Sequence, residues 1–173
     1  MVHPQKYNGT YTGYWAGYKF KEKLGYTTGV HTGVDYNYGS GNDDKGFTTT
    51  AICDGKVVAK ISNGTVKGFG NALIIESLVP SGVAGTKMYH RYMHMNTITV
   101  VKGQTVKQGQ KIGTVGNTGT TYAHTHLDVW TNRNGLSAHW EYHKDTQLAS
   151  YEDPYKLIEK YKSWTGTPPP KPP

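Results

Sequence analysis

Apolar and β-branched runs between residues 48 and 131 set the main pattern of the chain. The segment TTTAICDGKVVAKIS (48–62) predicts two strands joined at Asp54–Gly55, a residue pair that favours tight hairpin turns. Further strands are expected in GNALIIESL (70–78), TKMYHRYMHM (86–95) and AHTHLDVWT (123–131). Short β runs broken by glycine fill 96–121. This pattern indicates a turn-rich β domain.

One segment predicts a helix, DPYKLIEKYKSW at 153–164. Asp153 can cap its N-terminus, Pro154 suits the first helical position, and apolar residues recur at helical spacing. Residues 1–30 predict loops and short irregular strands, whereas 132–150 show no clear period. The expected fold is mainly β: an antiparallel β-sheet core with long loops forming an open groove, and a short C-terminal helix.

The composition makes the chain strongly basic, which bears on its partners. The 173 residues carry a formal net charge of +7, which suits an anionic partner such as nucleic acid, a membrane surface or a bacterial wall. The basic residues form no single stripe, so nucleic acid is disfavoured as a partner. No apolar run approaches the length of about eighteen residues that a membrane span needs, so we expect no membrane insertion.

The two ends of the chain are polar. The last residues, TGTPPPKPP (165–173), are typical of an extended linker, so we expect one folded domain over 1–164 and a linker towards a missing second domain. The start, MVHPQKYNGTYTG, lacks the apolar core of a secretory signal. The single cysteine, Cys53, excludes an internal disulfide and is expected to be a buried, inert thiol.

Two short motifs each contain a pair of potential metal ligands. HTGVDY holds His31 and Asp35, and AHTHLD holds His124 and His126. Glycines around the first pair disfavour a helix, but an even spacing also faces one side of an extended segment. Strand alternation places both histidines of the second pair on one face. A catalytic zinc needs three such ligands, yet each pair alone is also compatible with surface or structural residues.

Other zinc classes do not fit, because the chain has neither a His-Glu-x-x-His motif nor several cysteines. His139 and His143, four apart in SAHWEYHKD, suit the wall of a cleft or a solvated loop better than a second metal site. Several tyrosines near the N-terminus could line a groove, although packing is the simpler expectation: Tyr11, Tyr14, Tyr18 and Tyr26.

Taken in order, the motifs resemble those of the lysostaphin-type family of zinc-dependent peptidoglycan endopeptidases. HTGVDY resembles the family's His-x-x-x-Asp motif, YMHM its Tyr-x-His motif, and AHTHLDV its His-x-His strand. Between them, TTTAICDGKVVAK, GFGNALIIES and VVKGQTVKQGQKIGTVGNTG resemble its strand pair, its Gly-x-Gly-Asn strand and its turn-rich run. The resemblance covers roughly residues 29–130.

The resemblance implies a role for each matching residue. His31, Asp35 and His126 would be the zinc ligands, and His124 would be the general base that activates the attacking water. His94 would be a second catalytic histidine that orients or stabilises the reacting groups. The sequence departs from the family at Thr125 and Leu127, where the family usually has Leu and Phe.

His90 is a rival for the role of His94. Residues 90, 92 and 94 are expected to share one face of a strand, but four strand residues span about 13 Å, so one histidine cannot easily replace the other. We therefore favour His94.

The function implied by the resemblance is zinc-dependent hydrolysis of peptide bonds in bacterial peptidoglycan, in the cross-bridge or the stem peptide, causing lysis. We expect a monomer that acts at the cell wall, as a phage endolysin domain or a fragment of a secreted lysin. Three alternatives stay open: a catalytically silent wall-binding or activator domain of the same fold, a zinc D-Ala carboxypeptidase, and a β module that binds sugar or nucleic acid.

Overall fold

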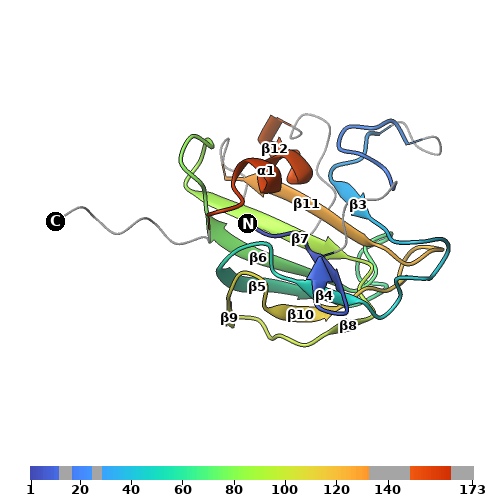
Figure 1. Ribbon diagram of the computed structural model, residues 1–173. Helices are drawn as coiled ribbons and strands as arrows, with labels where there is room; N and C mark the ends of the chain where they lie inside the picture. Colours follow the sequence, from blue (N-terminus) through green and yellow to red (C-terminus); the bar gives the residue numbers. More distant parts are fainter. Residues whose placement is uncertain (12–16, 25–28, 133–148, 165–173) are drawn as a thin grey trace.

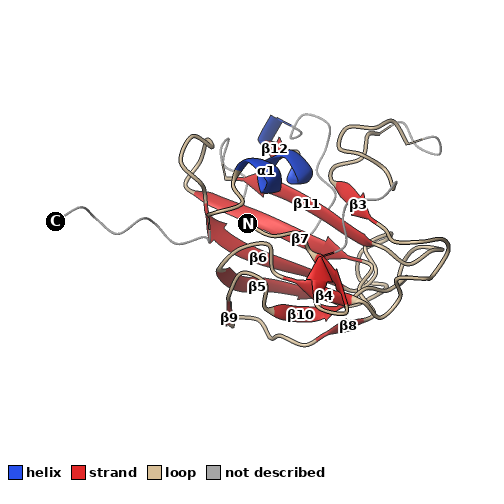
Figure 2. Cartoon of the chain, in the orientation of Figure 1, coloured by secondary structure: helices blue, strands red, loops and turns tan. Residues whose placement is uncertain are grey.

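The computed structural model of the chain describes residues 1–11, 17–24, 29–132 and 149–164, which form two antiparallel sheets and a short helix (Figures 1 and 2). The larger sheet has the order β12 (Tyr151–Glu152), β11 (Thr125–Thr131), β7 (Lys87–Met93), β6 (Ala72–Leu78), β5 (Gly55–Ile61) and β9 (Thr105–Val106), and β3 (Val34–Tyr36) also pairs with β11. The smaller sheet has the order β2 (Thr10–Tyr11), β1 (Gln5–Tyr7), β4 (Thr48–Thr50), β10 (Lys111–Thr114) and β8 (Thr97–Ile98). The expected mainly β fold is confirmed.

The larger sheet buries a different set of side chains on each face. Leu127 and Val129 of β11 point into the core between the two sheets, where Ile112 of the smaller sheet also packs. Trp130 points to the opposite face and packs in a second apolar cluster with Tyr89, its cross-strand partner on β7. Because side chains alternate along a strand, His126 lies on the same face as Trp130. That second face carries the candidate site.

The expected hairpin at Asp54–Gly55 is wrong. β4 pairs with β1 and β10 in the smaller sheet, whereas β5 pairs with β6 and β9 in the larger sheet. The buried residues 51–53 carry the chain from one sheet to the other. The Asp54 carboxylate accepts hydrogen bonds from the Gln108 N–H and from Lys107 rather than closing a turn. Gly55 serves close packing, because a Cβ there would lie 2.6 Å from the Glu76 carbonyl oxygen.

The other predicted elements are present with shorter bounds. β6, β7 and β11 lie inside the segments predicted as strands, and α1 (Pro154–Lys160) begins where the sequence predicts but ends before residue 164. The Asp153 carboxylate caps α1 by accepting the N–H groups of Tyr155 and Lys156 at 3.1 and 3.2 Å. Within the described ranges, no helix has the length and apolar character that crossing a membrane requires.

Candidate metal centre

Strand β3 brings the first motif to the second. β3 runs antiparallel to β11 so that Asp35 lies directly opposite His126, although 91 residues separate them in the chain. Gly33 allows this approach, because a Cβ at that position would collide with the Leu127 carbonyl oxygen. His31 lies just before β3, where its backbone exchanges hydrogen bonds with Lys21 and Glu22. The local fold therefore delivers both members of the first motif to one face of β11.

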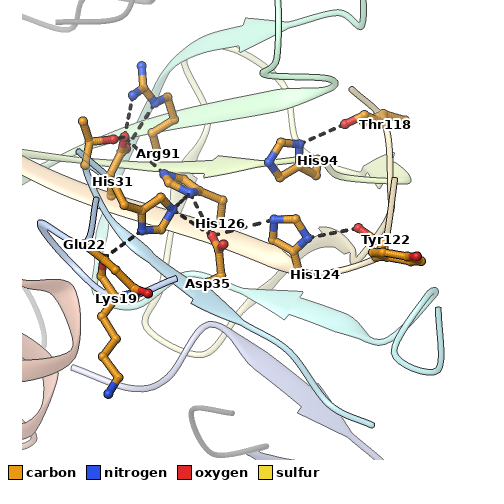
Figure 3. Close-up of polar contacts among 12 residues, drawn as sticks. Lys19, Glu22, His31, Asp35, Arg91, His94, Thr118, Tyr122, His124 and His126 are labelled. Carbon is orange, nitrogen blue, oxygen red and sulfur yellow. Dashed lines mark hydrogen bonds and ion pairs between the residues drawn. The ribbon is translucent and has the colours of Figure 1, made fainter. Parts of the chain in front are cut away.

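Three ligand atoms converge at this point. Nε2 of His31, Oδ1 of Asp35 and Nδ1 of His126 lie within 4.8 Å of one another. The pairwise separations are 2.9 Å between the two histidine nitrogens, 2.9 Å from His126 to Asp35, and 3.1 Å from His31 to Asp35. All three side chains are nearly buried. The structure thus groups the three residues that the sequence singles out as metal ligands (Figure 3).

The polar contacts on the far side of each ring indicate which ring nitrogens carry lone pairs. Nδ1–H of His31 donates to the Lys19 carbonyl oxygen at 3.2 Å, which leaves its Nε2 without a proton in the neutral ring. Nε2 of His126 faces the Asp128 carboxylate at 3.5 Å, which favours a proton on that nitrogen and a lone pair on Nδ1. Two nitrogen lone pairs and a carboxylate oxygen therefore face one another. Such an arrangement repels itself unless a cation lies between the atoms, so the residues fit a metal ion.

The electrostatics of the cluster favour a cation as well. Burial acts to raise the pKa of Asp35, but the contacts with the His126 and His31 side chains outweigh it and hold the pKa well below its usual range. Burial acts to lower the pKa of His126, but the neighbouring carboxylates of Asp128 and Asp35 raise it to about 9. The carboxylates thus stabilise positive charge at the point where the three ligand atoms meet.

Two further histidines lie beside the three candidate ligands. The rings of His94 and His124 are 4.6 Å apart between centroids, and His124 Nε2 is 3.7 Å from Asp35 Oδ1 (Figure 3). Nδ1–H of His94 donates to the Thr118 carbonyl oxygen, and Nδ1–H of His124 donates to that of Tyr122, each at 3.0 Å. Both rings therefore keep an Nε2 lone pair free to accept a proton or a hydrogen bond.

Both of these rings are neutral at physiological pH. Burial, helped by the charges of His124 and His126, lowers the pKa of His94 to about 3, and burial also lowers the pKa of His124. A neutral ring with an exposed Nε2 lone pair can accept a proton. His124 is the more accessible of the two rings, and its neighbour Tyr122 is exposed.

His94 does not share a strand face with His90, so that expectation is wrong. β7 ends at Met93, and His94 takes the left-handed conformation with φ of 63°, which is rare for a residue other than glycine. Simple alternation would place His94 in the core beside Tyr92. The left-handed turn instead brings it to the face that holds His126, with the ring centroids 6.2 Å apart. Strain of this kind is often found at functional sites.

His90 lies in the core between the sheets. Its Nε2 is 2.8 Å from Ser77 Oγ and its Nδ1 is 2.9 Å from the Tyr92 hydroxyl. Cys53 Sγ is 3.4 Å from the same Ser77 oxygen, and burial raises the pKa of this thiol to about 12. The expected burial of Cys53 is confirmed, and the raised pKa disfavours a reactive thiolate. The polar network of His90 faces away from the metal cluster, so His90 is no rival for His94.

The N-terminal segment covers part of the site. A Cβ at Gly17 would collide with the Asp35 side chain, and the Tyr18 carbonyl oxygen accepts the Asp35 N–H. The Tyr18 ring is 5.7 Å from that of His31. Tyr18 thus packs beside the candidate site. The expectations for Tyr14, Tyr26, His139 and His143, and for the linker at 165–173, fall outside the described residues.

Sequence reasoning missed one pair beside the cluster, Asp128 and Arg91. Both are fully buried, and they face each other across β11 and β7. Strand alternation could have pointed to Asp128, because it lies two residues after His126 and therefore on the same face of β11.

A comparison with known families agrees with this geometry. Residues 29–138 match the model of Peptidase family M23. The chain belongs to peptidase family M23. The match begins just before His31 and extends past His126, so it includes all five candidate site residues. The resemblance to the lysostaphin-type family is confirmed.

Relatives of this M23 chain include both an activator and peptidases. The murein hydrolase activator NlpD of Escherichia coli is 32% identical over 111 residues, which are 64% of this chain and 26% of NlpD. The chain therefore matches only about a quarter of the length of that relative.

Two solved structures are also similar to the M23 chain. The catalytic domain of the antimicrobial peptidase lysostaphin from Staphylococcus simulans has 27% identity and a TM-score of 0.56, and the match covers 83% of this chain and 90% of that one. A zinc-containing peptidase from Vibrio cholerae has 32% identity and a TM-score of 0.54, covering 73% of this chain and 35% of that one.

Proposed function

We propose that this M23 chain is a zinc-dependent endopeptidase that hydrolyses peptide bonds in bacterial peptidoglycan. The observation that carries the proposal is the convergence of His31, Asp35 and His126 beside two neutral histidines. Three protein ligands of this kind are typical of catalytic zinc, which keeps an open coordination position. The similarity to lysostaphin and to the zinc-containing peptidase supports both the metal and the reaction.

The three ligands have the chemistry that zinc prefers, two imidazole nitrogens and a carboxylate oxygen. Bound there, zinc would supply Lewis acidity that polarises the scissile carbonyl group and acidifies a water molecule. Nδ1–H of His31 is held by the Lys19 carbonyl oxygen, which keeps Nε2 directed to the other ligands. Asp35 contributes the negative charge that offsets part of the charge of a divalent ion.

His124 is the proposed general base. Its Nδ1 proton is held by the Tyr122 carbonyl oxygen, so Nε2 is free to take a proton from the attacking water and pass it to the leaving amine. His94 has the same arrangement with Thr118. Because its pKa is lowered to about 3, His94 suits a role as hydrogen-bond acceptor, orienting the water, better than a role as donor to a developing oxyanion.

The surroundings of the site support a wall polymer as substrate. The formal net charge of +7 favours anionic walls. One relative is a murein hydrolase activator, and a similar solved structure is that of an antimicrobial peptidase. We assign the catalytic unit to residues 1–164 and read 165–173 as a linker. The same proposal includes action at the cell wall and lysis of the target cell. The protein would act as a monomer, either released from a phage-infected host or as part of a secreted lysin.

The similarity to NlpD favours a second candidate, a catalytically silent domain that activates another hydrolase. A silent domain has no need for a complete set of ligands and bases. Because all five positions are filled and converge here, we rank this candidate second.

The proposal is tested by digesting purified Gram-positive walls of several cross-bridge types and identifying new termini by mass spectrometry. The samples are the wild type, the wild type with a chelator, His126→Ala, and His3→Ala as a histidine control outside the site. New amino and carboxyl termini at a defined internal bond, lost with chelator and in His126→Ala but kept in His3→Ala, would support it. No cleavage of any wall by folded, zinc-loaded protein would favour the silent domain. Release of single terminal residues would favour a carboxypeptidase.

A further inference from the structure

A buried ion pair lies directly behind His126. The Arg91 guanidinium donates to both carboxylate oxygens of Asp128, with Nε at 3.1 Å from Oδ1. The Thr32 hydroxyl donates to Oδ2 at 3.2 Å, and His126 Nε2 faces the same oxygen at 3.5 Å. Arg91 and Asp128 have no exposed surface. One carboxylate therefore touches an arginine, a threonine and the far side of a candidate metal ligand.

The position of this carboxylate is fixed on every side. Asp128 lies opposite Arg91 in the register of β11 and β7. The guanidinium lies 4.2 Å from the Phe69 ring centroid and 5.4 Å from that of Trp130, so aromatic rings hold its plane. A two-pronged guanidinium contact fixes the orientation of a carboxylate as well as its place. The Oδ2 atom of Asp128 therefore faces His126 from a carboxylate that Arg91 and Thr32 hold in place.

We propose that Asp128 is a positioning residue that holds Nε2–H of His126, and thereby fixes Nδ1 as the metal-binding atom. The inference rests on the proposed zinc site. A histidine that binds a metal through one ring nitrogen commonly gives the other N–H to a carboxylate, which sets the tautomer and the ring orientation. Arg91 supports this role because its hydrogen bonds to both oxygens of Asp128 fix the orientation of the carboxylate that faces His126.

A purely structural role for the pair makes a different prediction. Buried ion pairs often stabilise a fold no better than well-packed apolar residues of similar volume, so the pair need not be there for stability. If stability were its only role, replacing both partners by apolar residues would leave zinc affinity unchanged. If Asp128 positions His126, that replacement restores the fold but not the affinity.

The experiment measures zinc affinity by competition with a chelator, and thermal stability, on the full chain. Asp128→Asn keeps the shape and removes the charge, and the double variant Arg91→Met with Asp128→Leu removes the pair altogether. Thr32→Val is the matched control, because it removes a neighbouring contact of Asp128 and leaves the carboxylate in place. We expect zinc affinity to fall about 10- to 100-fold in Asp128→Asn and in the double variant, and to change less than about 3-fold in Thr32→Val.

A second readout needs no variant. In nitrogen-detected NMR spectra of zinc-loaded wild type, His126 should bind the metal through Nδ1 and show a strongly downfield-shifted proton on Nε2. A proton on Nδ1, or wild-type zinc affinity in a folded Asp128→Asn or double variant, would overturn the inference. A wild-type chain that binds no zinc would instead overturn the proposed function.

Discussion

Two backbone carbonyl groups decide what the paired histidines can do. Thr118 and Tyr122 each accept the Nδ1 proton of one ring, so His94 and His124 present lone pairs and not protons to the centre of the site. Their low pKa values keep them in that state at physiological pH. The protein thus specifies the chemistry of two identical side chains through the tautomer that the backbone selects.

Replacing either ring should impair catalysis without emptying the metal site. We expect His124→Ala to lower kcat about 100- to 10,000-fold, the usual contribution of a general base, and His94→Ala to lower it by at least about 10-fold. Zinc affinity should stay within about 3-fold of the wild type, because neither ring is one of the three proposed ligands. Steady-state kinetics and chelator competition check this. Retained activity in His124→Ala would exclude it as the base.

The buried His90 should make stability depend on pH. Burial lowers its pKa from 6.5 to about 3, so between these values the unfolded chain binds a proton that the folded chain does not. Stability therefore falls as pH drops from about 6.5 towards 3, by up to about 1.4 kcal/mol per pH unit from this residue. Denaturant unfolding across this range should give a smaller slope for His90→Gln. Equal slopes in the two proteins would contradict the assignment.

At the scale of the elements, the antiparallel pairing of β3 with β11 assembles the candidate site. The backbone at Gly33 touches that of Leu127, which sets Asp35 opposite His126. A side chain at residue 33 would push the two strands apart at the point where the ligands meet.

Gly33→Ala should therefore both destabilise the fold and weaken zinc binding. Its Cβ would collide with backbone, which cannot move aside as a side chain can. We expect a loss of at least about 2 kcal/mol beyond that of the control Gly64→Ala, which has a left-handed φ of 87° but open space around its Cβ. Chemical denaturation and chelator competition measure both effects. Equal stability of the two variants would show that β3 can shift without cost.

The strands could be predicted from sequence because they depend on local alternation, whereas the choice of His31, Asp35 and His126 as candidate ligands came from the family resemblance. The hydrophobic pattern finds β6, β7 and β11, and an even spacing places His124 and His126 on one face. Which strands pair with each other depends on distant parts of the chain, so local pattern does not predict it. The Asp54–Gly55 pair suits a hairpin turn, but the buried residues 51–53 lead the chain into the other sheet, where β5 pairs with β6.

Two features of the site needed the structure. His94 leaves the face predicted by alternation because its φ is positive. A histidine gives no sequence signal for this conformation, which glycine, asparagine and aspartate adopt most readily. Asp128 reads as an ordinary polar residue until its neighbours are known. The hydrophobic pattern therefore predicts neither the backbone conformation of a single residue such as His94 nor the cross-strand partners of a residue such as Asp128.

At the scale of the whole molecule, the site and the main core lie on opposite faces of one sheet. The core between the sheets contains aliphatic residues of both sheets and of α1. The candidate ligand His126 lies on the other face of β11, because side chains alternate along the strand. The fold is therefore not built on the metal, unlike small zinc domains that unfold when the metal is removed.

Removal of zinc should thus abolish activity and leave a folded protein. Because a bound metal stabilises the folded state by mass action, the Tm should fall on chelation. The unfolding transition should remain cooperative and the far-ultraviolet circular dichroism unchanged. Calorimetry and circular dichroism of chelated and zinc-loaded protein test this, and loss of the transition on chelation would show that the metal is part of the core.

The most direct test of the account is a titration of metal-free protein with zinc while cleavage of a purified wall substrate is followed. The account predicts that activity rises linearly to a plateau at one zinc per chain, and that His126→Ala shows no such rise. Full cleavage by metal-free protein, or an unchanged titration in His126→Ala, would contradict the claim that His31, Asp35 and His126 hold the metal of a peptidoglycan endopeptidase.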